Sequence, residues 1–187
     1  MQERIIGRML APLQRAIANM AARATVALVN SAGRIQRVQM RLLNGEAKQG
    51  LDHFEAYGLT SNPHPGAEGL ALFLAGDRSH GVVINIGDRR YRLTSLAPGE
   101  VALYDDLGQK VHLTRGGIVI DGAGLPMLLT NTPLVRMETP QLEVTGEIKD
   151  RCDTDGRTMS GMRAIYNSHT HPENDSGGPT DQPNQSM

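Results

Sequence analysis

Large aromatic side chains are nearly absent from this sequence of 187 residues. It has no tryptophan, its only phenylalanines are Phe54 and Phe73, and aromatic residues make up 3% of the chain, while glycine occurs 21 times. The rigid side chains that usually anchor a thick core are therefore scarce. This composition favours narrow, repetitive β-structure over a thick globular core.

Cysteine is equally scarce, since Cys152 is the only one. A single cysteine cannot form a disulfide within its own chain, and without a C-x-x-C partner it provides neither a redox motif nor a zinc motif. We interpret Cys152 as a buried or idle thiol.

Long apolar runs and a strong net charge are also lacking. Glu3, Arg4 and Arg8 interrupt the N-terminal sequence, which indicates neither a secretory signal nor a membrane span, so we expect synthesis in the cytoplasm. The formal net charge of -1 excludes a generic polyanion binder, and no nucleic-acid partner is expected. Residues 1–98 carry a net charge of +5 and residues 99–187 a net charge of -6, which predicts two halves with different surfaces.

The N-terminal segment, residues 1–23, has the pattern of a helical arm. Apolar residues recur at helical spacing from Ile5 to Met20, with arginines distributed around them. Pro12 is expected to kink or divide this helix. A basic amphipathic helix can lie on a membrane surface, but we favour an arm that docks onto a neighbouring subunit.

Residues 24–97 change to short β-runs separated by turns. Five strands in about 70 residues fit a small barrel of the OB type. His53, His64 and His80 lie in this region without mutual ligand spacing and are expected to be surface or capping groups. The predicted strands are Thr25–Val29, Arg34–Arg41, Leu70–Leu74, Gly81–Ile86 and Tyr91–Leu93.

Residues 98–160 have a still shorter strand rhythm. Apolar residues are spaced by two, so each strand presents one apolar face that it cannot bury alone, and the intervening glycines and prolines leave no room for a covering helix. A β-helix shaft made of three interwound chains would cover these faces, and the predicted fold class is therefore all-β. The predicted strands here and just beyond are Glu100–Tyr104, Lys110–Thr114, Gly117–Ile120, Met127–Thr130, Leu134–Met137, Leu142–Thr145 and Arg163–Tyr166.

Two histidines one residue apart, His169 and His171, precede a C-terminal end rich in glycine and proline. In an extended segment both imidazoles point to the same side. Two nitrogens are too few to hold a transition metal tightly, and no Cys, Asp or Glu nearby completes a known ligand spacing.

Three interpretations of this pair remain open from the residues alone. The histidines can be solvated polar groups, or belong to a cupin-like metalloenzyme, although Glu173 follows His171 too closely for that motif. Alternatively, three chains meeting on an axis bring six imidazoles around one ion. Six nitrogen donors fit octahedral iron better than zinc, and such a saturated ion would be structural because it leaves no position for substrate.

The run Asn167-Ser168-His169-Thr170-His171-Pro172 and the trailing Gly177-Gly178-Pro179 carry a family resemblance. With the arm, the barrel region and the one-sided strands before it, this motif resembles the central spike proteins of contractile-tailed bacteriophages, the baseplate assembly protein V group, and within it the phage Mu type. The resemblance covers nearly the whole chain.

The resemblance implies a homotrimeric structural protein at the tip of the tail baseplate of the virion, which pierces the host outer membrane and contacts the baseplate hub and tail tube proteins. The shaft would be a needle, and its apex, residues 161–187, would hold one structural iron per trimer through His169 and His171 of each chain. Some members also hold calcium and chloride, for which Asp150, Asp153 and Asp155 are candidate calcium ligands, with a solvated acidic turn as the alternative. No enzymatic activity is expected, because the chain lacks the lysozyme insert of larger spikes.

A trimeric receptor- or carbohydrate-binding fibre is the alternative function. Such a fibre would be expected to expose aromatic residues for sugars, and beyond Leu96 the chain has only Tyr104 and Tyr166. Residues 173–187 have the composition of a disordered tail, and if ordered they are expected to fold back over the chain.

Overall fold

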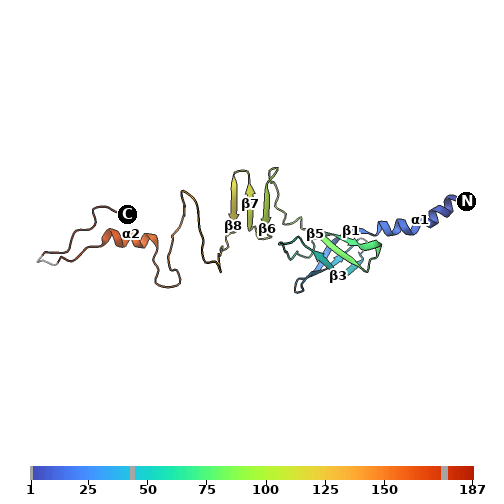
Figure 1. The fold of residues 1–187 in the computed structure, drawn as a ribbon, viewed down its shortest axis with the longest axis horizontal. Helices are drawn as coiled ribbons and strands as arrows, with labels where there is room; N and C mark the ends of the chain where they lie inside the picture. The colour runs from blue at the N-terminus through green and yellow to red at the C-terminus, as the bar shows by residue number, and fades with distance from the viewer. Residues whose placement is uncertain (1, 43–44, 174–176) are drawn as a thin grey trace. The chain divides into compact units, whose positions relative to one another are not determined.

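The computed structural model describes residues 2–42, 45–173 and 177–187. It separates into two compact units, Met1–Leu128 and Leu129–Met187. The first unit contains a helix, a barrel and a small sheet, and the second contains a helix (Figure 1). The elements of the described residues are α1 (Gln2–Ala18), β1 (Ala21–Asn30), β2 (Gln36–Arg41), β3 (Ala47–Phe54), β4 (Glu68–Phe73), η2 (Leu74–Gly76), β5 (Gly81–Gly87), β6 (Val101–Tyr104), β7 (Lys110–Thr114), β8 (Gly117–Asp121) and α2 (Met159–Ser168).

The strands β1 to β5 close into a barrel in the order β1-β2-β3-β5-β4 (Figure 1). Strands β3 and β5 run parallel, and the other neighbouring pairs, including β1 with β4, are antiparallel. The small barrel predicted for this region is therefore present.

Two details of the predicted strands were wrong. Strand β3 was missed because its alternation is broken: Gly50 has a φ of 66°, and the register between β2 and β3 shifts between Val38 and Met40. No strand forms at Tyr91–Leu93. The Asp88 carboxylate accepts a 3.0 Å hydrogen bond from the Arg90 amide, which makes this segment a turn.

The barrel interior holds the hydrophobic core and is narrow. Phe73 is the only aromatic residue in the described core, and a side chain at Gly81 would place its Cβ 2.7 Å from the Phe73 ring. Small residues therefore face large ones across the interior. The buried core consists of Ala24, Val26, Val38, Met40, Leu42, Leu51, Ala67, Ala71, Phe73 and Val83.

His53 was expected on the surface, and that expectation is wrong. The residue is 5% exposed inside the barrel, opposite Gln36 on β2. Its Nδ1 lies 2.8 Å from the Gln36 side-chain oxygen, while the Gln36 amide nitrogen donates a 2.6 Å hydrogen bond to the Ser61 carbonyl. The pair is tolerated in the core because these polar groups satisfy one another.

Strands β6, β7 and β8 form an antiparallel three-stranded sheet within the first unit (Figure 1). The register aligns apolar side chains in two rows across the sheet, and this confirms the predicted one-sided strands. Each of these side chains is at least 37% exposed. One row is Val101, Leu113 and Ile118, and the other is Leu103, Val111 and Ile120.

The second unit has little regular structure before α2. Residues 127–130, 134–137 and 142–145 lie outside any strand of the single chain. Their pairing between chains stays a prediction.

Helix α1 runs through Pro12 from Gln2 to Ala18, so Pro12 does not divide the helix. The end of α1 packs near η2, where a side chain at Gly76 would come within 2.5 Å of the Ala16 carbonyl oxygen. Apolar side chains farther along the described part of the helix are exposed, including Met9 at 75% and Leu13 at 57%. Among the described residues, none of the helices combines the length and apolar character needed to cross a bilayer.

The two phenylalanines give a matched test of the barrel core. Phe73→Ala should lower the free energy of unfolding by about 3–5 kcal/mol, because Phe73 is 1% exposed and its loss leaves a cavity. Phe54, at the end of β3, is 56% exposed, and Phe54→Ala should cost less than about 1 kcal/mol. Guanidinium unfolding of both variants measures this, and equal losses would contradict the assigned core.

The buried His53 predicts acid sensitivity of the barrel. Burial lowers the pKa of His53 below its ordinary value of 6.5, against a smaller opposing effect of the Glu55 carboxylate. As the pH falls below about 6.5 the unfolded chain binds the proton before the folded chain does, so stability decreases in that range. His53→Gln keeps a donor for Gln36 and should reduce the loss of stability between pH 7.5 and pH 5.

The control is His80→Gln, since the His80 side chain is 81% exposed. Guanidinium unfolding midpoints at the two pH values should match those of the unmodified protein for this variant. An equally large acid loss in His53→Gln would exclude His53 as the cause.

Candidate metal centre

Helix α2 lies immediately before the histidine pair. The Thr158 hydroxyl caps its start by accepting a 3.1 Å hydrogen bond from the Gly161 amide. Met159, Met162 and Tyr166 recur at helical spacing on α2. The strand predicted at Arg163–Tyr166 is therefore wrong. Four residues span about one helical turn and are too few to show the helical period.

His169 and His171 come together although a helix precedes them. His169 is the C-cap of α2, has an extended backbone (φ −72°, ψ 150°) and donates its amide to the Ile165 carbonyl. The ring centroids of His169 and His171 lie 5.1 Å apart, edge to face. One chain thus places two imidazoles side by side.

The ring of His169 is oriented by the helix that precedes it. Its Nδ1 lies 2.6 Å from the Tyr166 carbonyl oxygen, and the Tyr166 ring lies 5.5 Å from its own. A carbonyl oxygen only accepts, so Nδ1 carries the proton in the neutral ring and Nε2 keeps its lone pair. A second nitrogen fixed by a backbone carbonyl is the usual arrangement of a histidine ligand.

The C-terminal residues hold the motif from the other side. The His171 amide donates to the Thr180 hydroxyl at 2.8 Å, and the Thr180 amide donates to the His171 carbonyl at 2.9 Å. The Met187 amide donates to the Asn167 side chain at 2.9 Å. The described part of the tail therefore folds back over the histidine motif, as expected for an ordered tail. That prediction covered residues 173–187, of which 174–176 lie outside the described residues.

These two imidazoles do not make a complete site in one chain. Across the described ranges, no group of three His, Cys, Asp or Glu side chains has the geometry to hold a metal ion. The donor set of neutral imidazoles suits a divalent transition metal, but two donors leave most of its positions to other ligands.

The predicted calcium ligands do not gather around one point either. The Asp150 carboxylate accepts from the Arg157 amide at 2.9 Å, and Asp155 pairs with Arg151 at 2.8 Å. Cys152 is a free, exposed thiol, which excludes the buried alternative of the prediction for this residue and leaves the idle thiol. Calcium and chloride stay predictions.

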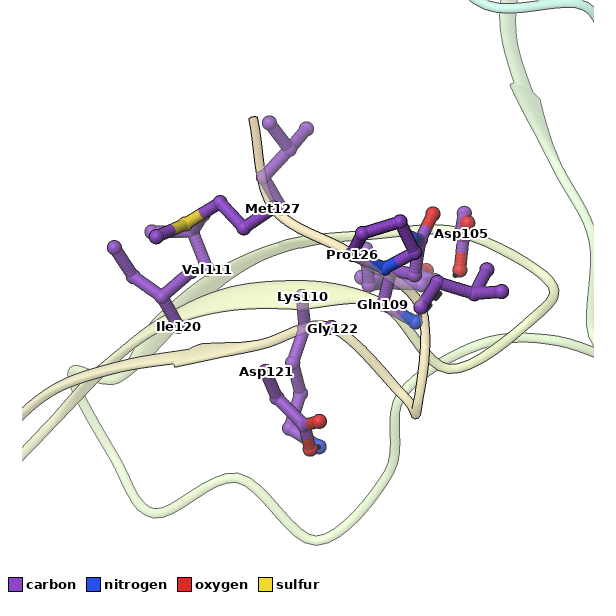
Figure 2. A pocket seen from close by; sticks show the side chains of 12 residues that line it. Asp105, Gln109, Lys110, Val111, Ile120, Asp121, Gly122, Pro126 and Met127 are labelled. Atoms are coloured by element: carbon purple, nitrogen blue, oxygen red, sulfur yellow. Dashed lines mark hydrogen bonds and ion pairs between the residues drawn. The ribbon is translucent and has the colours of Figure 1, made fainter. Parts of the chain in front are cut away.

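A second feature of functional interest is the apolar face of the β6–β8 sheet. Figure 2 shows Val111, Ile120 and Met127 gathered at a pocket, with Lys110 and Asp121 on the other side of their strands. The Lys110 amine and the Asp121 carboxylate form a 2.8 Å ion pair across β7 and β8. The sheet therefore has one apolar face, which the chain covers only in part, and an opposite face that carries this ion pair together with Val119 and Tyr104.

A closed barrel followed by a sheet with an uncovered apolar face defines the class of β-structured protein to which this chain belongs, and contiguous apolar patches of this kind are rare on monomeric soluble proteins. Comparison with known sequences agrees with that class. The family description "Bacteriophage Mu Gp45, N-terminal" matches residues 23–90, which include the barrel strands.

Two relatives extend the match beyond the barrel. The "Baseplate puncturing device gp45" of Escherichia phage Mu is 32% identical over 144 residues, which is 77% of this chain and 73% of that protein. The "Mu-like prophage FluMu protein gp45" of Haemophilus influenzae (strain ATCC 51907 / DSM 11121 / KW20 / Rd) is 31% identical over 148 residues, 76% of this chain and 81% of that protein. The chain therefore belongs to the phage Mu gp45 family, as the resemblance to phage spike proteins predicted.

Sequence reasoning found the histidine pair but missed the groups that orient it. The Tyr166 carbonyl is a backbone atom and has no sequence signal, although the helical spacing of Met159 and Met162 would have predicted the helix that places it. Thr180 lies nine residues after His171, and nothing in the tail composition marks it as a partner.

The contact with Tyr166 predicts the tautomer of one histidine. In metal-free protein at pH 8, the neutral ring of His169 should carry its proton on Nδ1, because the Tyr166 carbonyl accepts only there. Nitrogen-15 shifts of the imidazoles distinguish the tautomers. His171, whose ring makes no hydrogen bond to any described residue, is the internal comparison, and a proton on Nε2 of His169 would contradict the geometry.

Proposed function

We propose that this chain is a structural protein of the phage virion, the central spike at the tip of a contractile-tail baseplate that pierces the host outer membrane. The observation that carries the proposal is the uncovered apolar face of β6–β8 in a chain of the Mu gp45 family. The printed name of the Mu relative, a baseplate puncturing device, favours a spike over a receptor-binding fibre.

The proposed assembly is a homotrimer whose OB-type barrels contact the baseplate hub and tail tube. Val101, Leu103 and Ile118 are each at least 62% exposed on one sheet face, and burying such side chains stabilises an assembly by about 1.5–3 kcal/mol each. Three interwound copies would bury these faces against one another. Folding of the shaft and assembly would then be one event.

The proposed apex is a structural iron site shared by three chains. His169 and His171 of each copy would supply six nitrogens, and the fixed Nδ1 of His169 leaves its Nε2 free to bind. Bound there, the ion would tie three chain ends together, where metal sites in small domains contribute on the order of 10 kcal/mol. A saturated site of this kind offers no position for a substrate, consistent with a structural role.

The residues around the apex suit a tip under load. Chain ends fray first unless they are held, and here Thr180 and Met187 return to the histidine motif. Residues 99–187 carry a net charge of -6, which opposes attraction to an anionic bacterial surface. Entry by force fits this charge better than adhesion does.

Metal analysis tests the proposed apex. The purified protein should contain about one iron per three chains and sediment as three copies of the 20.2 kDa chain. Replacing both ligands, His169→Ala with His171→Ala, should abolish the iron while leaving the barrel folded. His80→Ala is the control and should leave the iron content unchanged.

Unchanged iron in the double variant would exclude these histidines as ligands. Sedimentation of the unmodified protein as a single chain would overturn the trimeric spike itself, whatever its metal content.

A further inference from the structure

A seven-residue unit recurs between β8 and α2. Thr132-Pro133 begins one unit and Thr139-Pro140 the next, and Pro126 lies another seven residues upstream. The same turn forms twice: the Thr132 hydroxyl donates to the Leu134 carbonyl at 3.0 Å, and the Thr139 hydroxyl donates to the Gln141 carbonyl at 2.9 Å. We call residues 132–138 and 139–145 the Thr-Pro units.

Side-chain contacts within the units show which residues share a side of the chain. The Arg136 guanidinium pairs with the Glu138 carboxylate at 2.6 Å, and the side-chain amide of Gln141 donates a 2.8 Å hydrogen bond to the Glu143 carboxylate. Contacts between residues two apart are those of an extended chain with its polar side chains on one side. The fourth and sixth residues of each unit then lie on the other side.

Those fourth and sixth residues are all large and apolar. They are Val135 and Met137 in the first unit, 50% and 61% exposed, and Leu142 and Val144 in the second, 60% and 49% exposed. Each Thr-Pro unit therefore exposes an apolar pair at its fourth and sixth positions. Within residues 129–187, the described part of the chain leaves these side chains about half exposed or more.

The backbone of the Thr-Pro units is also unpaired. In the part of the chain that the structure describes, no backbone-to-backbone hydrogen bond involves residues 126–147. Such extended backbone is a template for pairing with another chain, because unpaired amide and carbonyl groups are costly to bury. Proline has no amide hydrogen, so one donor is missing from this edge every seven residues.

We propose that the Thr-Pro unit sets the register in which copies of this chain pair along the shaft. A second copy carries the same apolar pair and the same missing donor at the same spacing, so every contact is matched when the copies are aligned or offset by whole units. A partner chain without this seven-residue period would not align its apolar side chains with the apolar pairs, and its backbone amide donors would not be matched to Pro133 and Pro140. The inference rests on the proposed trimer and adds its repeating unit.

The consequence is a shaft that tolerates a change of length only in steps of seven residues. Removing one whole unit leaves the turns, the apolar pairs and the proline spacing unchanged. The Thr132 and Thr139 turns interrupt the extended chain once per unit, so a period of seven residues can return the apolar pair to the same face. Removing six residues instead leaves one extra residue before the next Thr-Pro turn, so that turn and the apolar pairs and proline after it fall out of step with those upstream.

Two deletions in the full chain that differ by one residue test this. Deleting residues 132–138 joins Asn131 to Thr139 and keeps the distance from Pro126 to Pro140 at seven residues. Deleting residues 133–138 retains Thr132 and makes that distance eight. The first variant should sediment as three copies and melt within about 2 °C of the unmodified protein, while the second should melt more than about 5 °C lower or lose the three-copy mass.

The outcomes separate this inference from the proposed function. Equal behaviour of the two deletions, whether both are intact or both are disrupted, would overturn the Thr-Pro register and leave the trimeric spike standing if the unmodified protein has three copies. A single-chain mass for the unmodified protein would overturn both.

Discussion

The constraint on which the structure depends is that its C-terminal half exposes apolar side chains that its own chain does not cover. In the barrel, β1 to β5 close on themselves and bury Phe73, Met40 and Val83. The β6–β8 sheet cannot do this, because three strands with one apolar face need a second layer. The barrel is thus complete in one chain, while the apolar faces of the sheet and of the Thr-Pro units stay exposed in a single chain, and further copies would cover them in the proposed trimer.

The histidine pair has the same incompleteness in another form. His169 and His171 lie side by side and are held by α2 and the tail, yet they supply two donors where a transition metal takes four to six. Exposed apolar faces and an incomplete ligand set lie in one chain of the Mu gp45 family. Assembly of three copies around an axis would cover the apolar faces and complete the ligand set together. For this reason we treat the shaft and the apex as parts of one proposed assembly.

The sequence predicted what depends on local alternation and missed what depends on irregular backbone. The paired rows of β6–β8 followed from residues two apart, whereas β3 was hidden by the register shift beside Gly50. The histidine pair was evident from its spacing, but the Tyr166 carbonyl and Thr180 that orient it are not readable from side-chain type. The proline spacing is visible in the sequence, and its meaning emerged only from the repeated Thr132 and Thr139 hydrogen bonds.

Backbone amide exchange over residues 126–147 of the full-length protein tests the central claim most directly. In one chain these amides make no backbone hydrogen bond within the described residues, so in an isolated chain they would exchange within seconds. The account predicts protection comparable to that of the barrel strands, except at the prolines, because other copies would pair with this segment in the proposed trimer. Rapid exchange throughout the segment, with the barrel still protected, would contradict it.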